Sequence, residues 1–349
     1  MASRSKQPYI AAAAGVVIVA LSDLAVAATS TTSGGSSSSA QLDTTAATQL
    51  ISTTTLSQML AISNALTARS IMRMGPPPTL PNQVSDSGQT FSMAAGGAAA
   101  QWNIWGNISG NKNTFNDGLS YLSAKTTNTI LGGDYALNPT LTVGASAAVD
   151  NGDGDTGIPG GTTGYDSSGF TLAPYISWQI DKDWSWDASM GWGQGKYKQT
   201  GYSDDKSDRF FYGTNINYVQ WYSNIQLTAR GSFLHGEEKY KGANIGGVAV
   251  LGTNPKNKID QWRLGVQAAY WMDGVMPYAG VAYSTDTGRS TTTTFATPDN
   301  LGKDAWVWSV GVNFMAVGNN LTGGIVYNKE SGRSNSKNDN LMANISYRF

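Results

Sequence analysis

The stretch that decides the fold is the last one in the chain, LMANISYRF (341–349). Every second residue in it is apolar or aromatic: Leu341, Ala343, Ile345, Tyr347 and Phe349. A period of two is typical of a β-strand whose two faces meet different surroundings. Chain ends usually fray unless something holds them. Alternation up to the final residue therefore predicts a strand that is paired along its whole length.

The same alternation runs through the C-terminal 250 positions and predicts a protein that is almost entirely β-strand. From about residue 100 onward, apolar and polar residues alternate in segment after segment. We predict twelve strands, near 101–111, 124–137, 139–149, 168–180, 183–196, 208–221, 223–235, 259–272, 275–286, 304–317, 319–329 and 340–349.

The connections between these segments favour a membrane barrel over a soluble β-sandwich. In chain order they alternate between long and short, and the long ones carry most of the charge. The predicted long connections are 111–123, 150–167, 197–207, 236–258, 287–303 and 330–339. An up-and-down meander with all its long loops at one end is typical of outer-membrane barrels. The sequence thus predicts an all-β fold, an antiparallel transmembrane β-barrel of about twelve strands spanning 100–349.

Composition supports this prediction and excludes several classes of function. Only 13% of the residues are charged, against about 25% in ordinary soluble proteins, and there are 11 Trp and 16 Tyr. A soluble sandwich would have to bury most of these Trp side chains, whereas a barrel places them at the membrane–water interface. The net charge of −1 predicts no nucleic-acid partner. The absence of cysteine excludes disulfides and thiolate sites.

The first 27 residues have the features of a secretory signal peptide. Arg4 and Lys6 precede an apolar run over 9–21, and small residues at Ala25 and Ala27 suit cleavage after Ala27. An uncleaved anchor is the alternative, but the run is shorter than the ~20 residues of a spanning helix. We expect export through the inner membrane and residence in the outer membrane of a Gram-negative cell.

Three further segments separate the signal peptide from the first strand. Residues 28–49 form a Ser/Thr-rich flexible segment. Residues 50–74 are predicted to be helical, and 75–99 form a Pro/Gly-rich linker. The helix mixes apolar and polar side chains, which suits a half-polar barrel lumen. The residues that we assign to this helix as a plug of the pore are Leu56, Leu60, Asn64 and Arg69.

Five charged residues share the strand face opposite the apolar one and should point into the lumen. They are Asp134, Asp187, Arg230, Arg263 and Arg348. A charge inside a barrel needs a partner or water. These residues could form a solvated structural network, or they could contact a pore helix or filter ions.

No segment carries a convincing catalytic or metal site. His235 is the only histidine, and Ser232 points to the other face of its strand, so a Ser–His pair is not expected. The stretch 150–157, DNGDGDTG, lacks the EF-hand spacing and is interpreted as a solvated loop tip. The glycine-rich 132–139, GGDYALNP, lacks a phosphate-loop lysine and is interpreted as a turn. We expect no enzymatic activity, no cofactor and no metal.

Several stretches resemble the β-domain of monomeric autotransporters. WNIWGNISG (102–110) resembles its first strand, and LGGDYALNPTLTVGASAAVDNG (131–152) its second hairpin. PYISW, PYAGVAY and the terminal ISYRF resemble further strands. The resemblance covers about 95–349. It implies a twelve-stranded barrel with a helix through its pore, and a terminal aromatic signal, Tyr347 and Phe349, read by the barrel-assembly machinery.

The segment that would hold a passenger departs from this pattern. Only 28–41 lies between the signal and the helical region, and the helix has a single asparagine, Asn64, where some members have a self-cleaving pair. We therefore expect a pore or translocator module without a sizeable passenger, which is a monomer in contact with outer-membrane lipids. The alternative is a surface interaction protein, adhesin-like, that uses its loops. An outer-membrane hydrolase is disfavoured by the lone histidine.

Overall fold

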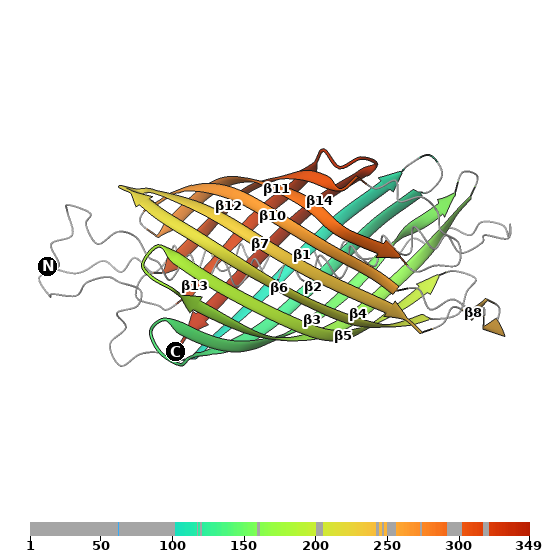
Figure 1. Cartoon of the computed structure of the whole chain (residues 1–349), viewed down its shortest axis with the longest axis horizontal. Coiled ribbons are helices and arrows are strands. Elements are labelled where there is room, and N and C mark those ends of the chain that lie inside the picture. Colours follow the sequence, from blue (N-terminus) through green and yellow to red (C-terminus); the bar gives the residue numbers. More distant parts are fainter. Residues whose placement is uncertain are drawn as a thin grey trace, which may run out of the picture.

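The computed structural model describes residue 62 and residues 102–349, apart from gaps at 117, 119–120, 159–160, 200–204, 242–243, 246–247, 250–255, 273, 292–301 and 317–320. Within this part of the chain, twelve antiparallel strands form one closed barrel (Figure 1). The predicted fold class is confirmed. No helix in the described residues is long and apolar enough to cross a membrane.

The barrel strands follow the chain order, and each pairs with its sequence neighbours. They are β1 (Trp102–Asn116), β2 (Tyr121–Ala136), β3 (Leu141–Ile158), β4 (Gly161–Gln179), β5 (Trp184–Gln199), β6 (Asp205–Tyr222), β7 (Ile225–Tyr240), β10 (Lys256–Tyr270), β11 (Val275–Thr291), β12 (Asp304–Ala316), β13 (Leu321–Ser331) and β14 (Ser336–Arg348). Two short strands, β8 (Asn244–Ile245) and β9 (Val248–Ala249), pair with each other between β7 and β10.

The last strand closes the barrel on the first, which explains the alternation at the chain end. Strands β1 and β14 pair from Asn103↔Arg348 to Phe115↔Ser336. The Trp102 N–H donates to the Phe349 carbonyl at 3.3 Å, and the Phe349 N–H donates to the Trp102 carbonyl at 3.1 Å. An unpaired edge in lipid would leave backbone groups without hydrogen bonds. The chain therefore keeps its strand pattern to the final residue.

The strands extend further than predicted at the end of the barrel opposite the C-terminus. Only residues 159–160 separate β3 from β4, and Asp153 lies directly opposite Asp166. The prediction of long loops at 111–123, 150–167 and 330–339 is therefore wrong, as is the loop tip at 150–157. Charged residues are typical of loops, but backbone pairing does not depend on side-chain polarity. Once aligned, the hairpins continue their ladders beyond the apolar band.

The tight turns at the other end follow from local side-chain chemistry. The Asn138 carboxamide oxygen accepts from the backbone N–H groups of Thr140 and Leu141, and Asp181 does the same for Asp183 and Trp184. Such short side chains close their own turns. These turns lie at the same end as the C-terminus (Figure 1).

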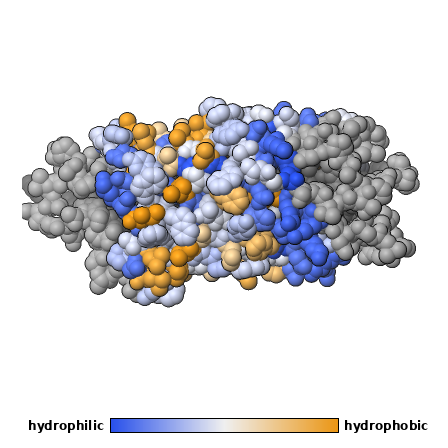
Figure 2. All heavy atoms as spheres, viewed as in Figure 1, coloured by the Kyte–Doolittle hydropathy of each residue, from blue (hydrophilic) through white to orange (hydrophobic). Residues whose placement is uncertain are grey.

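The two faces of the wall differ in the way that the alternation predicts. Large apolar side chains such as Ile104, Leu131 and Val310 are exposed on the outside, while polar side chains such as Asn107 and Asp187 are buried on the inside. Figure 2 shows apolar residues over the middle of one face and a hydrophilic band toward the end at which β8 lies. The outer surface therefore suits a lipid bilayer.

Candidate functional site: the barrel lumen

Amides and hydroxyls line the lumen beside the closing seam. On β1 five inward side chains are polar, Asn103, Asn107, Ser109, Asn111 and Asn113, and all are buried; Trp105 and Phe115 share this inward face. On β14 the inward residues Asn340, Asn344 and Ser346 continue this polar lining, with Met342 among them. Short polar side chains of similar length leave this part of the inner wall even and capable of hydrogen bonding.

A row of hydrogen bonds, which we name the seam ladder, runs across four strands. Ser309 on β12 donates to Asn328 on β13 at 2.7 Å, and Asn328 donates to Asn340 on β14 at 3.1 Å. Asn340 then donates to Asn111 on β1 at 2.6 Å. The seam between the first and last strands is thus joined by side chains as well as by the backbone.

An apolar cluster that faces inward extends from β1 across β2, β3 and β4 to β6 and β7. Its buried members are Trp105, Ile130, Ala148, Ala173, Tyr175, Phe211 and Leu234. Ile62 belongs to the same cluster, adopts a helical conformation and is 1% exposed. Ile62 is the one described residue of the predicted helix at 50–74. Its side chain is therefore buried together with apolar side chains that the barrel strands point inward.

Glycines on neighbouring strands make room for these large side chains. A methyl group at Gly132 would overlap the Trp105 indole, and one at Gly191 would overlap the Phe211 ring. Gly132 lies within β2, so the interpretation of 132–139 as a turn is wrong for its first half, and only 137–140 turn. Gly132 leaves space for a ring from the next strand, as glycine does where another group approaches closely.

Asp134 anchors the aromatic part of this wall. Tyr175 donates its hydroxyl to Asp134 at 2.8 Å, and the Trp105 indole N–H donates to the Tyr175 oxygen at 2.7 Å. Asn103 also donates to Asp134, at 3.2 Å. Asp134 was predicted to point inward; it is buried, and its hydrogen bonds hold neighbouring side chains of the wall in place.

Asp187 and Arg230 lie on one wall and are bridged by asparagines of the strand between them. Asn215 donates to Asp187 at 2.6 Å, and the Arg230 Nε donates to Asn217 at 3.2 Å. Asp187 is fully buried, and Arg230 is half-buried. The bridge keeps two opposite charges in one polar array inside the barrel.

Arg209, which sequence reasoning did not single out, centres a buried ion network. Its guanidinium contacts Asp150 on β3 at 2.7 Å and Glu238 on β7 at 3.0 Å. All three side chains are almost completely buried. Arg209 starts on β6 and crosses β5 and β4 to reach Asp150. Glycine at 169 and 195 leaves its path open, because a methyl group at either would overlap the guanidinium.

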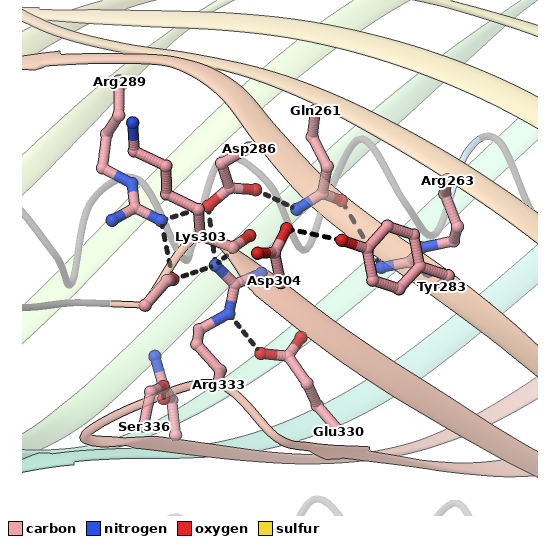
Figure 3. Close-up of polar contacts among 12 residues, drawn as sticks. Gln261, Arg263, Tyr283, Asp286, Arg289, Lys303, Asp304, Glu330, Arg333 and Ser336 are labelled. Carbon is pink, nitrogen blue, oxygen red and sulfur yellow. Dashed lines mark hydrogen bonds and ion pairs between the residues drawn. The ribbon is translucent and has the colours of Figure 1, made fainter.

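A second network, which we name the mouth network, lies inside the end of the barrel away from the C-terminus (Figure 3). Arg333, from the turn between β13 and β14, contacts Asp286 at 2.7 Å and Glu330 at 2.6 Å. It also donates to the carbonyl of Gly302 at 2.8 Å. Arg289 pairs with the same Asp286. Two connections of the barrel mouth are thereby tied to the wall.

Arg263, which was predicted to point inward, is linked to this network through one intermediate residue, Gln261. It donates to Gln261 at 3.4 Å, and Gln261 donates to Asp286 at 2.8 Å (Figure 3). Arg348 is half-buried and lies opposite Asn103 at the closing seam. The five predicted charges therefore do not form one cluster.

Tyr347 and Phe349 lie on the outer face of the closing strand. They are 49% and 51% exposed, and their rings stack with centroids 6.2 Å apart. The other four residues predicted for the pore helix, Leu56, Leu60, Asn64 and Arg69, lie outside the described residues.

His235 lies on the outer face and is held by carboxylates and aromatic rings. Its Nδ1 is 2.5 Å from Asp260, its Nε2 is 3.4 Å from Glu237, and its ring stacks on Tyr212. Both ring nitrogens thus face carboxylates, and neither faces a serine hydroxyl. In the described part of the chain no group of three His, Asp or Glu residues could hold a metal ion.

This geometry, a closed twelve-stranded wall around a partly apolar lumen, agrees with comparison to known proteins. The model of the autotransporter beta-domain matches residues 104–328. The chain belongs to the autotransporter β-domain family. Domains of this family are outer-membrane proteins. The barrel is a translocator domain, which is a transport pore module.

Solved structures of three autotransporters share the fold. The translocator domain of NalP from Neisseria meningitidis has a TM-score of 0.62 at 13% identity, covering 87% of this chain and 100% of that one. The transport unit of AIDA-I from Escherichia coli has a TM-score of 0.58 at 14% identity, covering 82% and 98%. The β-domain of the Bordetella autotransporter BrkA has a TM-score of 0.54 at 13% identity, covering 71% and 100%. No curated protein matches this chain in sequence.

Proposed function

We propose that the lumen of this translocator barrel is closed by the chain's own segment 50–74, so that the mature protein conducts ions poorly at rest. The observation that carries this proposal is the position of Ile62, which is helical, buried and packed on the inward apolar cluster.

The apolar cluster itself supports an occupied lumen. Apolar side chains that face a water-filled channel lose the stabilisation of burial, about 25 cal/mol for each Å² left exposed. Trp105, Ile130 and Phe211 are nonetheless 3% exposed or less. Twelve strands fall between the roughly eight of a barrel filled by side chains and the 16 or more of an open porin. A single helix suits this intermediate width.

Conductance in planar bilayers tests the proposal. Removal of 28–75, with the signal peptide kept, should raise single-channel conductance severalfold, because the obstruction leaves the lumen. The matched control removes only 28–41, which keeps the helix, and should conduct as poorly as the full mature chain. Heat-modifiable migration on gels confirms that each barrel is folded. Equal conductance in all three folded proteins would place 50–74 outside the pore.

Export and assembly form a second part of the proposal. Residues 1–27 act as a signal peptide, and the exposed pair Tyr347 and Phe349 is presented to the barrel-assembly machinery. Deleting Phe349 also removes its two backbone hydrogen bonds to Trp102, so the folded fraction should fall. Alanine at Phe349 keeps those bonds and separates recognition of the ring from backbone pairing. A normal membrane yield for both variants would contradict this assembly role.

The third part of the proposal is the orientation of the barrel in the outer membrane, with its long connections outside the cell. Protease should cut after the exposed Lys241, which directly follows β7, because Lys239 and Lys256 lie within the paired strands β7 and β10. Trypsin on intact cells should produce this cut. Cutting that appears only after the outer membrane is opened would reverse the orientation.

A surface interaction function remains the second candidate, because the hairpins exceed what a membrane requires. Strands β3 and β4 have 18 and 19 residues, whereas about 9–11 span a bilayer. The excess projects a paired ribbon beyond the apolar band. Shortening this hairpin by removal of 154–165 should abolish binding to a host or bacterial surface without changing conductance, if adhesion is the function.

A further inference from the structure

An arc of lysines lies on the outer face of the barrel wall, above its aromatic residues. The arc is formed by Lys196 on β5, Lys206 on β6, Lys239 and Lys241 at the end of β7, and Lys256 and Lys258 on β10. Three carboxylates share this part of the outer face on β6, β7 and β10, namely Asp208, Glu237 and Asp260, and a fourth, Asp166 on β4, lies opposite Lys198 on β5. The local charge is therefore positive although the whole chain has a net charge of −1.

Each of these three carboxylates already has a cation or a histidine as its partner. Asp208 pairs with Lys241 at 2.7 Å, and Glu237 pairs with Lys256 at 2.6 Å and Lys258 at 3.0 Å. Burial alone would raise the pKa of Glu237, but hydrogen bonds and charges from the two lysines outweigh it and lower the pKa to about 2. Asp260 contacts His235.

The remaining lysines of the arc have no carboxylate partner in the part of the chain that the structure describes. Among the described residues, no carboxylate lies within ion-pair distance of Lys196, Lys206 or Lys239. Lys196 lies directly opposite Lys206, and Lys239 lies directly opposite Lys256. Like charges directly opposite on neighbouring strands destabilise a sheet. Lys256 already contacts Glu237, and Lys239 also lies opposite Asp208 on β6, so the Lys196–Lys206 pair is the part of the arc that most needs an external anion.

The height of the arc on the wall identifies the kind of anion. Trp184 and Tyr218 pair near the C-terminal end of the barrel, with ring centroids 4.9 Å apart. The Lys196–Lys206 pair lies twelve positions further along both strands, from 184 to 196 and from 218 to 206. At about 3.3 Å per residue and a tilt near 40°, this separation is about 30 Å along the barrel axis.

The apolar band of an outer-membrane barrel is about 25 Å tall. The ammonium groups of the arc therefore lie just beyond the hydrocarbon, at the level of lipid headgroups. Directly below them on the same face, Trp192 packs near Phe210, and Tyr212 packs near His235. A ligand that contacts both surfaces needs an apolar part below and an anionic part above.

We propose that the lysine arc binds the phosphate groups of an anionic phosphoglycolipid of the outer leaflet. The proposal rests on the orientation given under the proposed function, in which this end of the barrel faces outward. A soluble protein or peptide is disfavoured, because the arc faces sideways along the wall above lipid-exposed rings. The acyl chains would lie against Trp192 and Phe210, and the phosphates would separate Lys196 from Lys206.

Lipid titration into the full mature barrel, folded in zwitterionic detergent, tests this proposal. The arc variant carries Lys196→Gln, Lys206→Gln and Lys239→Gln. The control variant carries Lys182→Gln, Lys303→Gln and Lys329→Gln, three exposed lysines outside the arc, and so loses the same charge. Bound phosphoglycolipid is counted by native mass spectrometry, and heat-modifiable migration shows that each protein is folded.

The arc variant should bind phosphoglycolipid about 100-fold more weakly than wild type, because each lysine near an anionic headgroup contributes about fivefold. The control variant should keep wild-type affinity. Equal binding by the arc variant and wild type, or an equal loss in both variants, would overturn the proposal.

Two further arms identify the source of the phosphate. The dephosphorylated glycolipid should not bind, and its undiminished binding would also refute the arc as a phosphate site. Inorganic phosphate alone should not compete at millimolar concentration; full competition would assign the lysines to a soluble anion. A barrel without 28–75 should bind the lipid normally, since the arc is on the outside. The proposal that 50–74 closes the pore and the proposal that the lysine arc binds lipid can therefore be refuted independently.

Discussion

The two halves of the lumen wall are built by different means. In the half formed by β2–β7, large rings and Arg209 extend across neighbouring strands over glycines. In the half formed by β10–β14, one ring, Tyr278, also lies over a glycine, Gly311. Most of that half is different, because amides and hydroxyls bond sideways in the seam ladder, and the mouth network joins its outer end. Strand β1 belongs to both, since it supplies Trp105 to the first and Asn111 to the second.

This difference separates two requirements of a translocator. A deep, apolar surface can hold one helix in a defined position, because shape complementarity adds to burial. An even polar surface offers hydrogen bonds to water or to a passing chain without fixing a single partner. We therefore expect the β2–β7 half to determine how the plug is seated and the seam half to determine how the barrel closes.

The largest predicted effect concerns the ion network of the first half. Arg209→Met leaves Asp150 and Glu238 buried without their cation, and breaking such a pair typically costs about 3–5 kcal/mol. We expect a matching loss in the free energy of unfolding, measured by urea titration of the barrel refolded in micelles. The change acts through the two orphaned carboxylates, not through lost packing alone.

A triple variant provides the check. Arg209→Met combined with Asp150→Asn and Glu238→Gln removes the orphaned charges and should recover most of the loss. If the triple variant is as unstable as the single one, the ion network is not the cause.

The mouth network should tolerate the equivalent change better. In Arg333→Met, Asp286 keeps Arg289 as a cation, so the predicted loss is about 2 kcal/mol, close to that of a hydrogen bond to a charged group. Lys337→Met, on the same hairpin and exposed, is the control and should be neutral. Losses equal to those of Arg209→Met would show that Arg289 does not compensate.

The sequence predicted the wall well and the lumen only in part. Alternation gave the twelve strands and the closing one, because the contrast between lipid and lumen acts on every second residue. It also placed Asp134 and Asp187 inward, but their partners come from other strands. The Arg209 network depends on Gly169 and Gly195. These glycines lie on two different strands, and the alternation within one strand does not show which residues of another strand lie beside it. Glycines at inward positions were the available signal.

Strand ends were predicted least well. Asp153 and Asp166 were assigned to a loop, although they face each other across a paired hairpin. Beyond the bilayer both sides of a strand meet water, so alternation no longer distinguishes strand from loop. The helix at 50–74, apart from Ile62, stays a prediction.

Adjacent glycines in β2 sharpen the comparison further. Gly132→Ala would place a methyl group against the Trp105 indole, and overpacking of this kind costs about 1–3 kcal/mol. Gly133→Ala is the control, because its methyl group would meet only the Asn103 carbonyl, at 3.7 Å. We expect a clear loss of unfolding free energy for the first and a loss below about 0.5 kcal/mol for the second. Similar values would indicate a strand-propensity effect without a role for Trp105.

The smallest predicted effect tests the seam ladder. Asn340 bonds to Asn328 on one side and Asn111 on the other, so Asn340→Ala leaves two buried amides each without one partner, at about 1–2 kcal/mol. Asn344→Ala is the matched control, since Asn344 faces the same lumen on the same strand but makes no side-chain hydrogen bond to any described residue. Because the ladder crosses the junction of first and last strands, its loss should mainly accelerate opening of the seam. Hydrogen exchange of the β1 and β14 amides should therefore rise about tenfold in Asn340→Ala and stay unchanged in Asn344→Ala, while β3 and β4 are unaffected in both. Uniform acceleration over all strands would mean that Asn340 stabilises the whole barrel and has no special role at its closure.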